Sequence, residues 1–194
     1  MTEIVPEPSG PELAALRDRL AAAAETEHLL DVGYAIVDSP VGRLLLAATD
    51  RGLVRVAYQI EDHDRVLEQL AARLGPRILR APRRLDRAAR QLEEYFTGRR
   101  TAFDLELDRT LSRGFRGVVH QYLPRIGYGR TATYREVAEQ VGRPRAFRAV
   151  GTACATNPLP IVVPCHRVVR SDGGPGQYAG GPAAKTALLA LEAA

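Results

Sequence analysis

Cys165 and His166 are adjacent residues near the C-terminus whose side chains could carry out nucleophilic chemistry. Cysteine attacks as the thiolate, and an ordinary thiol with a pKa of about 8.5 is only slightly ionised at neutral pH. A nearby imidazole can accept the thiol proton and so activate the sulfur. Residues 161–163 are predicted to be extended, and neighbours in an extended segment point to opposite faces. We therefore expect a turn or a bridging water to connect the two side chains.

The surroundings of this pair leave two interpretations open. The pair lies between an apolar run and a glycine-rich loop at 173–181, where a side chain could meet a ligand. Taken alone, however, a small buried cysteine beside a surface histidine is the more common arrangement. The other cysteine, Cys154, lies in an apolar helical pattern and is predicted to belong to the core. Both cysteines are expected to be free thiols, as in a reducing compartment.

Spacing and composition exclude several other kinds of protein. No Cys-x-x-Cys or His-x-x-x-His spacing occurs and the four histidines are scattered, so we expect no metal site and no cofactor. The N-terminal residues lack the basic and apolar regions of a signal peptide. No apolar run approaches the roughly 20 residues that span a bilayer. These features predict a cytoplasmic protein with no membrane partner.

Positive charge is concentrated in the second half of the chain. Residues 109–170 contain eleven arginines and only two acidic residues, although the net charge of the whole chain is +4. Such a basic block is typical of proteins that bind polyanions, including DNA. A generally arginine-rich composition is the alternative, and composition alone does not decide between them.

Residue patterns predict an α+β protein in three parts. An N-terminal extension over 1–32 includes a helix at 11–25. An α/β domain over 33–108 begins with a small antiparallel sheet, predicted from β-prone runs at 34–37, 43–47 and 53–57 that are separated by turn sequences. Apolar residues at helical spacing then predict helices at 62–74 and 85–96. Residues 101–107 alternate and are predicted to be a linker or an edge strand. Nothing in this domain indicates catalysis.

The third part, residues 109–194, is predicted to be mainly helical and to contain a helix-turn-helix. A helix is expected at 115–126, and another at 134–141, where Thr133 and Glu136 form a capping-box pattern. After a turn that includes Gly142, a further helix is expected at 146–155. Two short helices joined in this way are typical of a DNA-binding helix-turn-helix. The final helix is predicted at 185–192.

Five short motifs in the second half, taken in order, resemble those of the O6-alkylguanine-DNA alkyltransferases. The Pro-Cys-His-Arg-Val core of that family is unbroken at 164–168. The other matches are Ala-Thr-Tyr at 132–134, Arg-Ala-Val-Gly at 148–151, Gly-Gln-Tyr-Ala-Gly-Gly at 176–181 and Lys-Thr-Ala-Leu-Leu-Ala-Leu-Glu at 185–192. The resemblance covers the chain from about residue 115, and the first half matches only in its β-then-helix outline. The resemblance implies a ribonuclease-H-like N-terminal domain.

The resemblance also implies roles for individual residues. Cys165 would accept the alkyl group, with His166 acting on it through water as a base. Glu192 would orient the imidazole, and Asn157 would hold the turn around the site. Tyr134 would assist rotation of the nucleotide and donate a proton to the departing guanine.

DNA and the damaged base would be held by two further sets of residues. The resemblance implies DNA contacts at Thr133, Arg135, Arg145, Ala146 and Arg148, with Arg148 entering the duplex as a finger. The guanine pocket would be walled by Val168, Tyr178, Ala179 and Gly180. Ala179 stands where the family sometimes has serine, so one hydrogen bond to O6 would be missing.

The function implied is repair of double-stranded DNA by a single, irreversible alkyl transfer from O6-alkylguanine to Cys165. O4-alkylthymine is a further implied substrate, and the protein is expected to be a monomer without metal. One alternative is a non-enzymatic damage sensor or regulator, against which the presence of Cys165 argues. The other is a thiol hydrolase, which the basic block does not favour.

Overall fold

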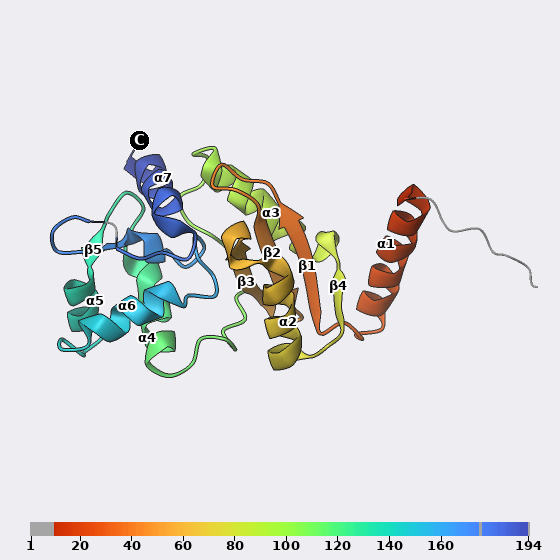
Figure 1. The fold of residues 1–194 in the computed structure, drawn as a ribbon, viewed down its shortest axis with the longest axis horizontal. Helices are drawn as coiled ribbons and strands as arrows, with labels where there is room; N and C mark the ends of the chain where they lie inside the picture. Colours follow the sequence, from red (N-terminus) through yellow and green to blue (C-terminus); the bar gives the residue numbers. More distant parts are fainter. Residues whose placement is uncertain (1–9, 175, 194) are drawn as a thin grey trace, which may run out of the picture.

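The computed structural model describes residues 10–174 and 176–193 and shows two halves side by side (Figure 1). The first half is built around a small sheet and the second is mainly helical, which confirms the predicted α+β class. Residues 1–9 of the predicted extension and Pro175 of the glycine-rich loop lie outside the described residues. None of the described helices is long and apolar enough to cross a membrane.

The sheet has four strands in the order β3-β2-β1-β4. They are β1 (Val32–Val37), β2 (Leu44–Thr49), β3 (Gly52–Tyr58) and β4 (Ile78–Arg80). The first three strands pair antiparallel, as predicted, but β4 pairs parallel to β1, so the sheet is mixed. Strand β4 was not predicted, because a three-residue strand is too short to show a two-residue period.

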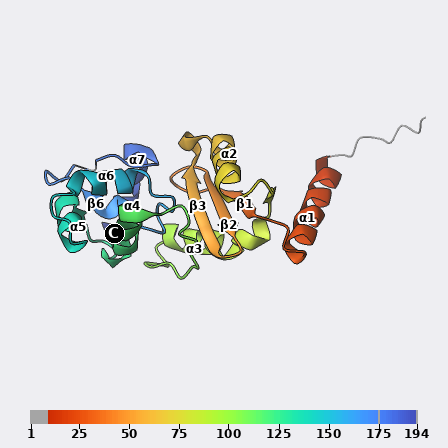
Figure 2. The same ribbon diagram turned by 90° about the horizontal axis from the view of Figure 1, so that it is seen from below.

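Helices cover both faces of this sheet (Figure 2). A 3-10 helix (Gln59–Glu61) leads into α2 (His63–Leu74), and α3 (Pro82–Phe96) follows β4. Leu45 and Ala47 of β2 pack with α2 through Val66 and Leu70, whereas the alternate residues of β2 face α3. All six residues of β2 are buried, as expected for a strand covered on both faces. Helix α1 (Gly10–Thr26) contacts β4 at the far end of the molecule.

The second half contains short helices around one pair of short parallel strands. Its elements are α4 (Gly114–Tyr122), a 3-10 helix (Leu123–Arg125), β5 (Ala132–Thr133), α5 (Tyr134–Gln140), α6 (Phe147–Ala155), a 3-10 helix (Cys165–Arg167), β6 (Val168–Val169) and α7 (Gly181–Ala193). The predicted capping box is present, because Thr133 Oγ1 accepts from Glu136 N and Glu136 Oε2 accepts from Thr133 N. Helices α5 and α6 pack together as the predicted helix-turn-helix.

Residues 161–163 do not form the predicted extended segment. Val163 N donates to Leu159 O at 2.8 Å, and Ile161 has a φ of +72°, so the chain turns here. The proline-rich flanks remove backbone donors and leave a compact turn instead of a strand. Residues 101–107 form the predicted linker, apart from one isolated bridge between Leu107 and Leu53.

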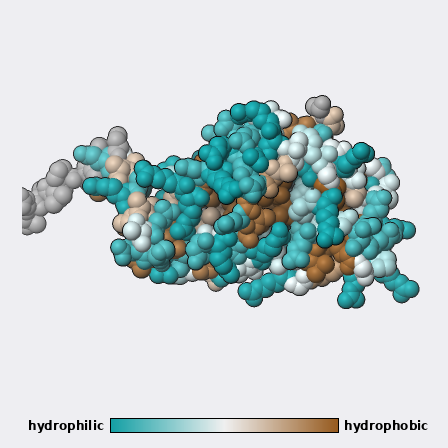
Figure 3. Space-filling view, turned by 180° about the vertical axis from the view of Figure 1, so that it is seen from behind, coloured by the Kyte–Doolittle hydropathy of each residue, from teal (hydrophilic) through white to brown (hydrophobic). Residues whose placement is uncertain are grey.

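The two halves share one hydrophobic core. A single cluster of buried side chains includes Leu85 and Leu92 of α3 together with Leu159 and Leu188 of the second half. Val56 N of β3 donates to Pro158 O at 2.8 Å, which links the sheet to the turn before Cys165. Figure 3 views the side away from Figure 1 and shows apolar surface gathered near the middle of the molecule. The turn before Cys165 is therefore braced by the first half.

Candidate functional site

Cys165 lies at the start of a 3-10 helix, and its side chain is almost completely enclosed at 1% exposure. Asn157 Nδ2 lies 3.1 Å from Cys165 Sγ and donates to Val163 O at 2.8 Å, while Asn157 Oδ1 accepts from Leu159 N. This one amide therefore bonds across the turn and to the sulfur. Burial raises the pKa of the Cys165 thiol to about 11, against the hydrogen bond from Asn157 and the charge of Lys185, which lower it. The thiol needs a base to react at neutral pH.

His166 is placed to be that base. Its Nε2 lies 2.8 Å from Glu192 Oε1, and a carboxylate can only accept, so Nε2 carries the proton and Nδ1 keeps its lone pair. Nδ1 is buried and has no hydrogen-bond partner among the described residues. Burial lowers the pKa of His166, although its hydrogen bond with Glu192 acts in the opposite direction. The imidazole is therefore neutral at physiological pH and can accept a proton.

Glu192 is held by five donors. They are Tyr95 Oη at 2.7 Å, His166 Nε2 at 2.8 Å, Arg167 Nε at 2.8 Å, Arg167 Nη2 at 2.9 Å and Gly129 N at 3.2 Å. Burial acts to raise the pKa of this carboxyl, but the hydrogen bonds from His166 and Arg167 outweigh it and lower the pKa to about 2. The carboxylate stays ionised and fixes the orientation of the imidazole.

Three of the residues that donate to Glu192 were not predicted as site residues: Arg167, Tyr95 and Gly129. Arg167 lies inside the Pro-Cys-His-Arg-Val motif and is 6% exposed, so its place beside Cys165 and His166 could have indicated a structural ion pair. Tyr95 lies at the end of α3 in the first half, 97 residues before Glu192. No local pattern marks it, because it reads as one more core residue of an amphipathic helix.

The glycine-rich loop reaches the site through Tyr178 and Gly180. Tyr178 is buried, and its Oη lies 2.9 Å from Tyr58 Oη at the end of β3. A Cβ on Gly180 would come within 2.6 Å of the Tyr58 ring, so only glycine fits there without a shift. Tyr58 is thus another unpredicted residue of the site.

The remaining predicted pocket residues lie on the same side. Val168 is buried in β6 and is the register partner of Ala132, while Ala179 is half-buried beside Tyr178. Burial is the main cause that raises the pKa of Tyr178, and the charge of a Cys165 thiolate would raise this pKa further. Val168 and Tyr178 are buried in the same hydrophobic cluster as Cys165, and Ala179 packs against that cluster.

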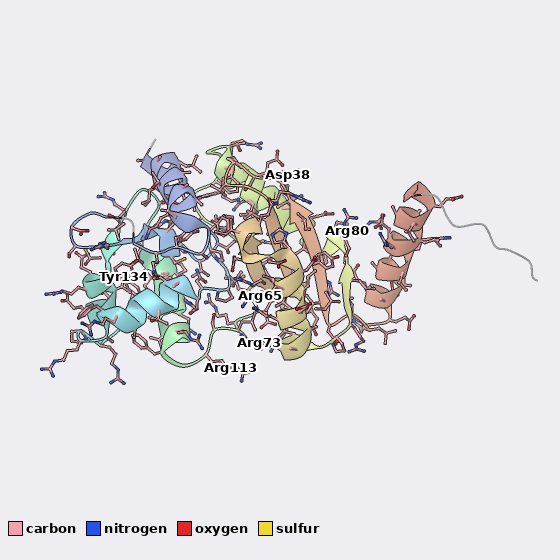
Figure 4. All side chains as sticks on the ribbon, viewed as in Figure 1. Asp38, Arg65, Arg73, Arg80, Arg113 and Tyr134 are labelled. Carbon is pink, nitrogen blue, oxygen red and sulfur yellow. The ribbon has the colours of Figure 1, made fainter. Side chains whose placement is uncertain are left out.

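Tyr134 lies where β5 passes into α5 (Figure 4). Burial raises the pKa of its hydroxyl to about 12, so it remains protonated and able to donate. A Cβ on Gly176 would lie 2.6 Å from Tyr134 Oη, which places the loop backbone directly against this hydroxyl. The ammonium of Lys185 lies 6.0 Å from the ring centroid and donates to Val168 O at 2.5 Å. A buried cation therefore lies beside the proposed proton donor.

The helix-turn-helix presents a basic surface. Arg135, Arg145 and Arg148 are exposed, and none forms an ion pair with another described residue. The guanidinium of Arg148 lies 5.8 Å from the ring centroid of Phe147, a 41% exposed neighbour that was not predicted. Ala146 is half-buried at the start of α6, whereas the hydroxyl of Thr133 is already engaged by Glu136. The arginines are thus free to meet phosphates.

The sulfur of Cys165 is enclosed by the residues that the structure describes. A hollow of about 480 Å³ lies beside the neighbours of Cys165 in the chain. It is lined by Pro164 and Arg167 together with Phe103 and Tyr128, but not by Cys165 itself. Cys165 is 1% exposed, so the atoms that enclose it must move before a substrate can reach Sγ. Within the described ranges, no group of three or more His, Cys, Asp or Glu side chains could hold a metal ion.

Comparison with known proteins finds one family across both halves. Two family models match the chain. The ribonuclease-like domain of 6-O-methylguanine DNA methyltransferase matches residues 32–109, and the DNA binding domain of 6-O-methylguanine DNA methyltransferase matches residues 114–194. A methylated-DNA–protein-cysteine methyltransferase of Methanosarcina barkeri is 40% identical over 82% of this chain and 96% of its own length. One from Mycolicibacterium paratuberculosis is 42% identical over 83% and 92%. A crystal structure of Mycobacterium tuberculosis OGT in complex with DNA superposes with a TM-score of 0.71 at 39% identity, covering 83% of this chain and 92% of that one.

Proposed function

The chain belongs to the 6-O-methylguanine DNA methyltransferase family, and we propose that it repairs DNA by moving one alkyl group from O6 of guanine to Cys165. The relatives named above are methylated-DNA–protein-cysteine methyltransferases, which assigns this enzyme class to the chain. The observation that carries the proposal is that His166, next to the buried Cys165, bonds Glu192 through Nε2 and keeps Nδ1 without a hydrogen-bond partner among the described residues. Such an arrangement can activate a thiol without a metal.

The transfer follows from the atoms that the site presents. The Cys165 proton passes through water to His166 Nδ1, and the sulfur attacks the alkyl carbon. An S–C bond forms as the C–O6 bond breaks, and the electron pair of that bond stays on the purine. Tyr134 donates a proton to the departing guanine and is reprotonated from solvent, to which His166 returns its own proton. The product is a thioether, which no group in the site can cleave, so each molecule acts once.

Reaching O6 in a duplex requires that the base leave the helix. Extrusion of a nucleotide costs a few kcal/mol, part of which a side chain entering the stack can offset. Arg148 suits this role because its planar guanidinium is exposed, unpaired by acids and supported by the Phe147 ring. Arg135 and Arg145, with the start of α6 at Ala146, would contact the phosphates, where most DNA-binding arginines bind. Thr133 would lie at the DNA surface because it directly precedes α5.

The enclosed sulfur adds one step to the mechanism. Because Cys165 is 1% exposed, part of its surroundings must move to admit a purine, and we propose that the segment with Gly176 and Tyr178 moves outward. Tyr178, Ala179, Gly180 and Val168 would then wall the base. Opening would also separate Gly176 from the Tyr134 hydroxyl and free that hydroxyl for the guanine.

The direct test uses a duplex that contains a single O6-methylguanine. The peptide with Cys165 should gain the mass of one methyl group, Cys165→Ala should gain none, and the matched Cys154→Ala variant should react as the wild type does. Methylation of Cys154 would overturn the assignment of the acceptor. Tight binding of the lesion without transfer would instead support a damage sensor.

We extend the proposal to O4-alkylthymine and to a monomeric protein. The same assay with O4-methylthymine should methylate Cys165 more slowly, and absence of the modified peptide would remove this substrate. Sedimentation of the free protein should give a single species near 21.2 kDa.

A further inference from the structure

We propose that Tyr95, a residue of the first half, is a positioning residue of the relay that activates Cys165. Its hydroxyl would hold the Glu192 carboxylate in place and would thereby set the orientation and proton affinity of His166. This inference rests on the proposed function, because it concerns the same thiol. It extends that function to a residue outside the DNA-binding half.

The position of Tyr95 is set by the packing of α3. Leu85, Ala88, Leu92 and Tyr95 recur at helical spacing and are all buried. The first three pack in the core beneath the sheet, whereas Tyr95 is the last of the row and reaches across to the second half. Its ring is enclosed by Phe96, Phe103 and Tyr128, with centroids 5.4, 5.4 and 6.2 Å away. The aromatic packing holds the ring in one position.

The hydroxyl of Tyr95 is explained by the carboxylate and not by the packing. A phenylalanine would fill the same apolar space, and a buried hydroxyl without a partner is unfavourable. Tyr95 Oη donates to Glu192 Oε1 at 2.7 Å and lies 3.5 Å from His166 Nε2. These are its hydrogen-bond partners among the residues that the structure describes. The hydroxyl is therefore specific to the relay.

The shared oxygen gives the contact a chemical consequence. Glu192 Oε1 accepts from Tyr95, from His166 and from Arg167 Nη2, so the phenol is one of the donors that draw electron density from the atom that holds the imidazole proton. The other groups facing the pair are Arg167, Lys185, Cys165 and Tyr178, and the first two favour a neutral imidazole. Loss of the Tyr95 hydroxyl would leave Oε1 a stronger acceptor and would favour imidazolium. His166 would then hold its proton to higher pH and would be a poorer base near neutrality.

The test compares Tyr95→Phe with Tyr128→Phe. Tyr128 packs against Tyr95, and its hydroxyl donates to the carbonyl of Leu191, the residue before Glu192. Tyr128→Phe therefore also removes one tyrosine hydroxyl beside Glu192, but one that does not bond the carboxylate. Single-turnover transfer is measured from pH 5 to 9. For Tyr95→Phe we expect transfer at pH 6 to be about tenfold slower, with the acid limb of the profile displaced to higher pH. Tyr128→Phe should keep the wild-type profile.

A second measurement needs no DNA and so separates this inference from the proposed function. Nitrogen-15 NMR of labelled histidine reports the tautomer and pKa of His166 in the free protein, with His166→Gln used to assign the signal. A raised pKa or a mixed tautomer in Tyr95→Phe supports the positioning role, even if the wild type fails to repair DNA. An unchanged His166 signal, together with an acid limb that coincides with the wild type, overturns it.

Discussion

The two halves of the molecule contribute to one site in different ways. The second half holds the nucleophile and every residue of the recognised motifs, within a stretch of short helices and turns. The first half holds none of those motifs. It nevertheless supplies the Tyr95 hydroxyl that bonds Glu192 and the Tyr58 hydroxyl that bonds Tyr178. Arg55 of β3 also donates to Pro158 O, in the turn that Asn157 organises. The difference shows that a motif can identify the reacting atoms while their support comes from a distant part of the chain.

The largest expected effect lies within the second half, at Glu192. Replacement by glutamine would remove the negative charge that pairs with Arg167 and orients His166, leaving a buried guanidinium unpaired. Breaking a buried ion pair in this way costs about 3–5 kcal/mol. We expect Glu192→Gln to unfold at a clearly lower urea concentration than the wild type and to transfer alkyl groups at least about a hundredfold more slowly. Urea unfolding and single-turnover assays measure both, and a variant of wild-type stability would contradict the pairing.

Acid should destabilise the protein through the same carboxylate. The pKa of Glu192 is lowered from 4.5 to about 2 in the folded chain, so its contribution to stability is complete above about pH 4.5 and is lost as pH falls toward 2. A shift of this size corresponds to about 3 kcal/mol. Urea unfolding of the wild type between pH 5 and 2 should show this loss, and Glu192→Gln should show a smaller one. Parallel curves for both proteins would place the acid sensitivity elsewhere.

A smaller effect is expected at the contact between the halves. Gly180→Ala would drive a methyl group into the Tyr58 ring, and overpacking of this kind costs about 1–3 kcal/mol. Adding Tyr58→Leu to Gly180→Ala should recover part of the loss, because the smaller side chain leaves room for the methyl group. A double-mutant cycle on urea unfolding measures the coupling, and strictly additive effects would mean that the two halves do not touch at this point.

The smallest effect on stability is expected at the surface of the second half. Arg148→Ala removes an exposed contact with Phe147 and should change the free energy of unfolding by less than about 1 kcal/mol. Transfer from duplex DNA should nevertheless fall, whereas transfer from the free base O6-methylguanine should stay as in the wild type. Equal losses on both substrates would argue that Arg148 supports the fold and not base extrusion.

Sequence by itself determined the features that depend on neighbouring residues. Hydrophobic period and capping residues predicted the helices and three strands, because these signals act within a few residues. The Pro-Cys-His-Arg-Val run identified Cys165 and His166 as the reacting pair, since the five residues are contiguous. The helix-turn-helix followed from the Thr133 capping box and the turn at Gly142. Beyond these, β4 was too short to be recognised, and the turn at 161–163 was mistaken for an extended segment.

Only the tertiary structure decided what surrounds the sulfur. Tyr58 and Tyr95 read locally as core residues, and their hydroxyls gained partners because packing across the halves brought them within 3 Å of Tyr178 and Glu192. The same packing enclosed Cys165 and left His166 Nδ1 without a hydrogen-bond partner in the described part of the chain. A hydrogen bond acts over about 3 Å of space, whatever the distance along the chain. Local patterns therefore name the groups that react, while the fold selects the groups that tune them.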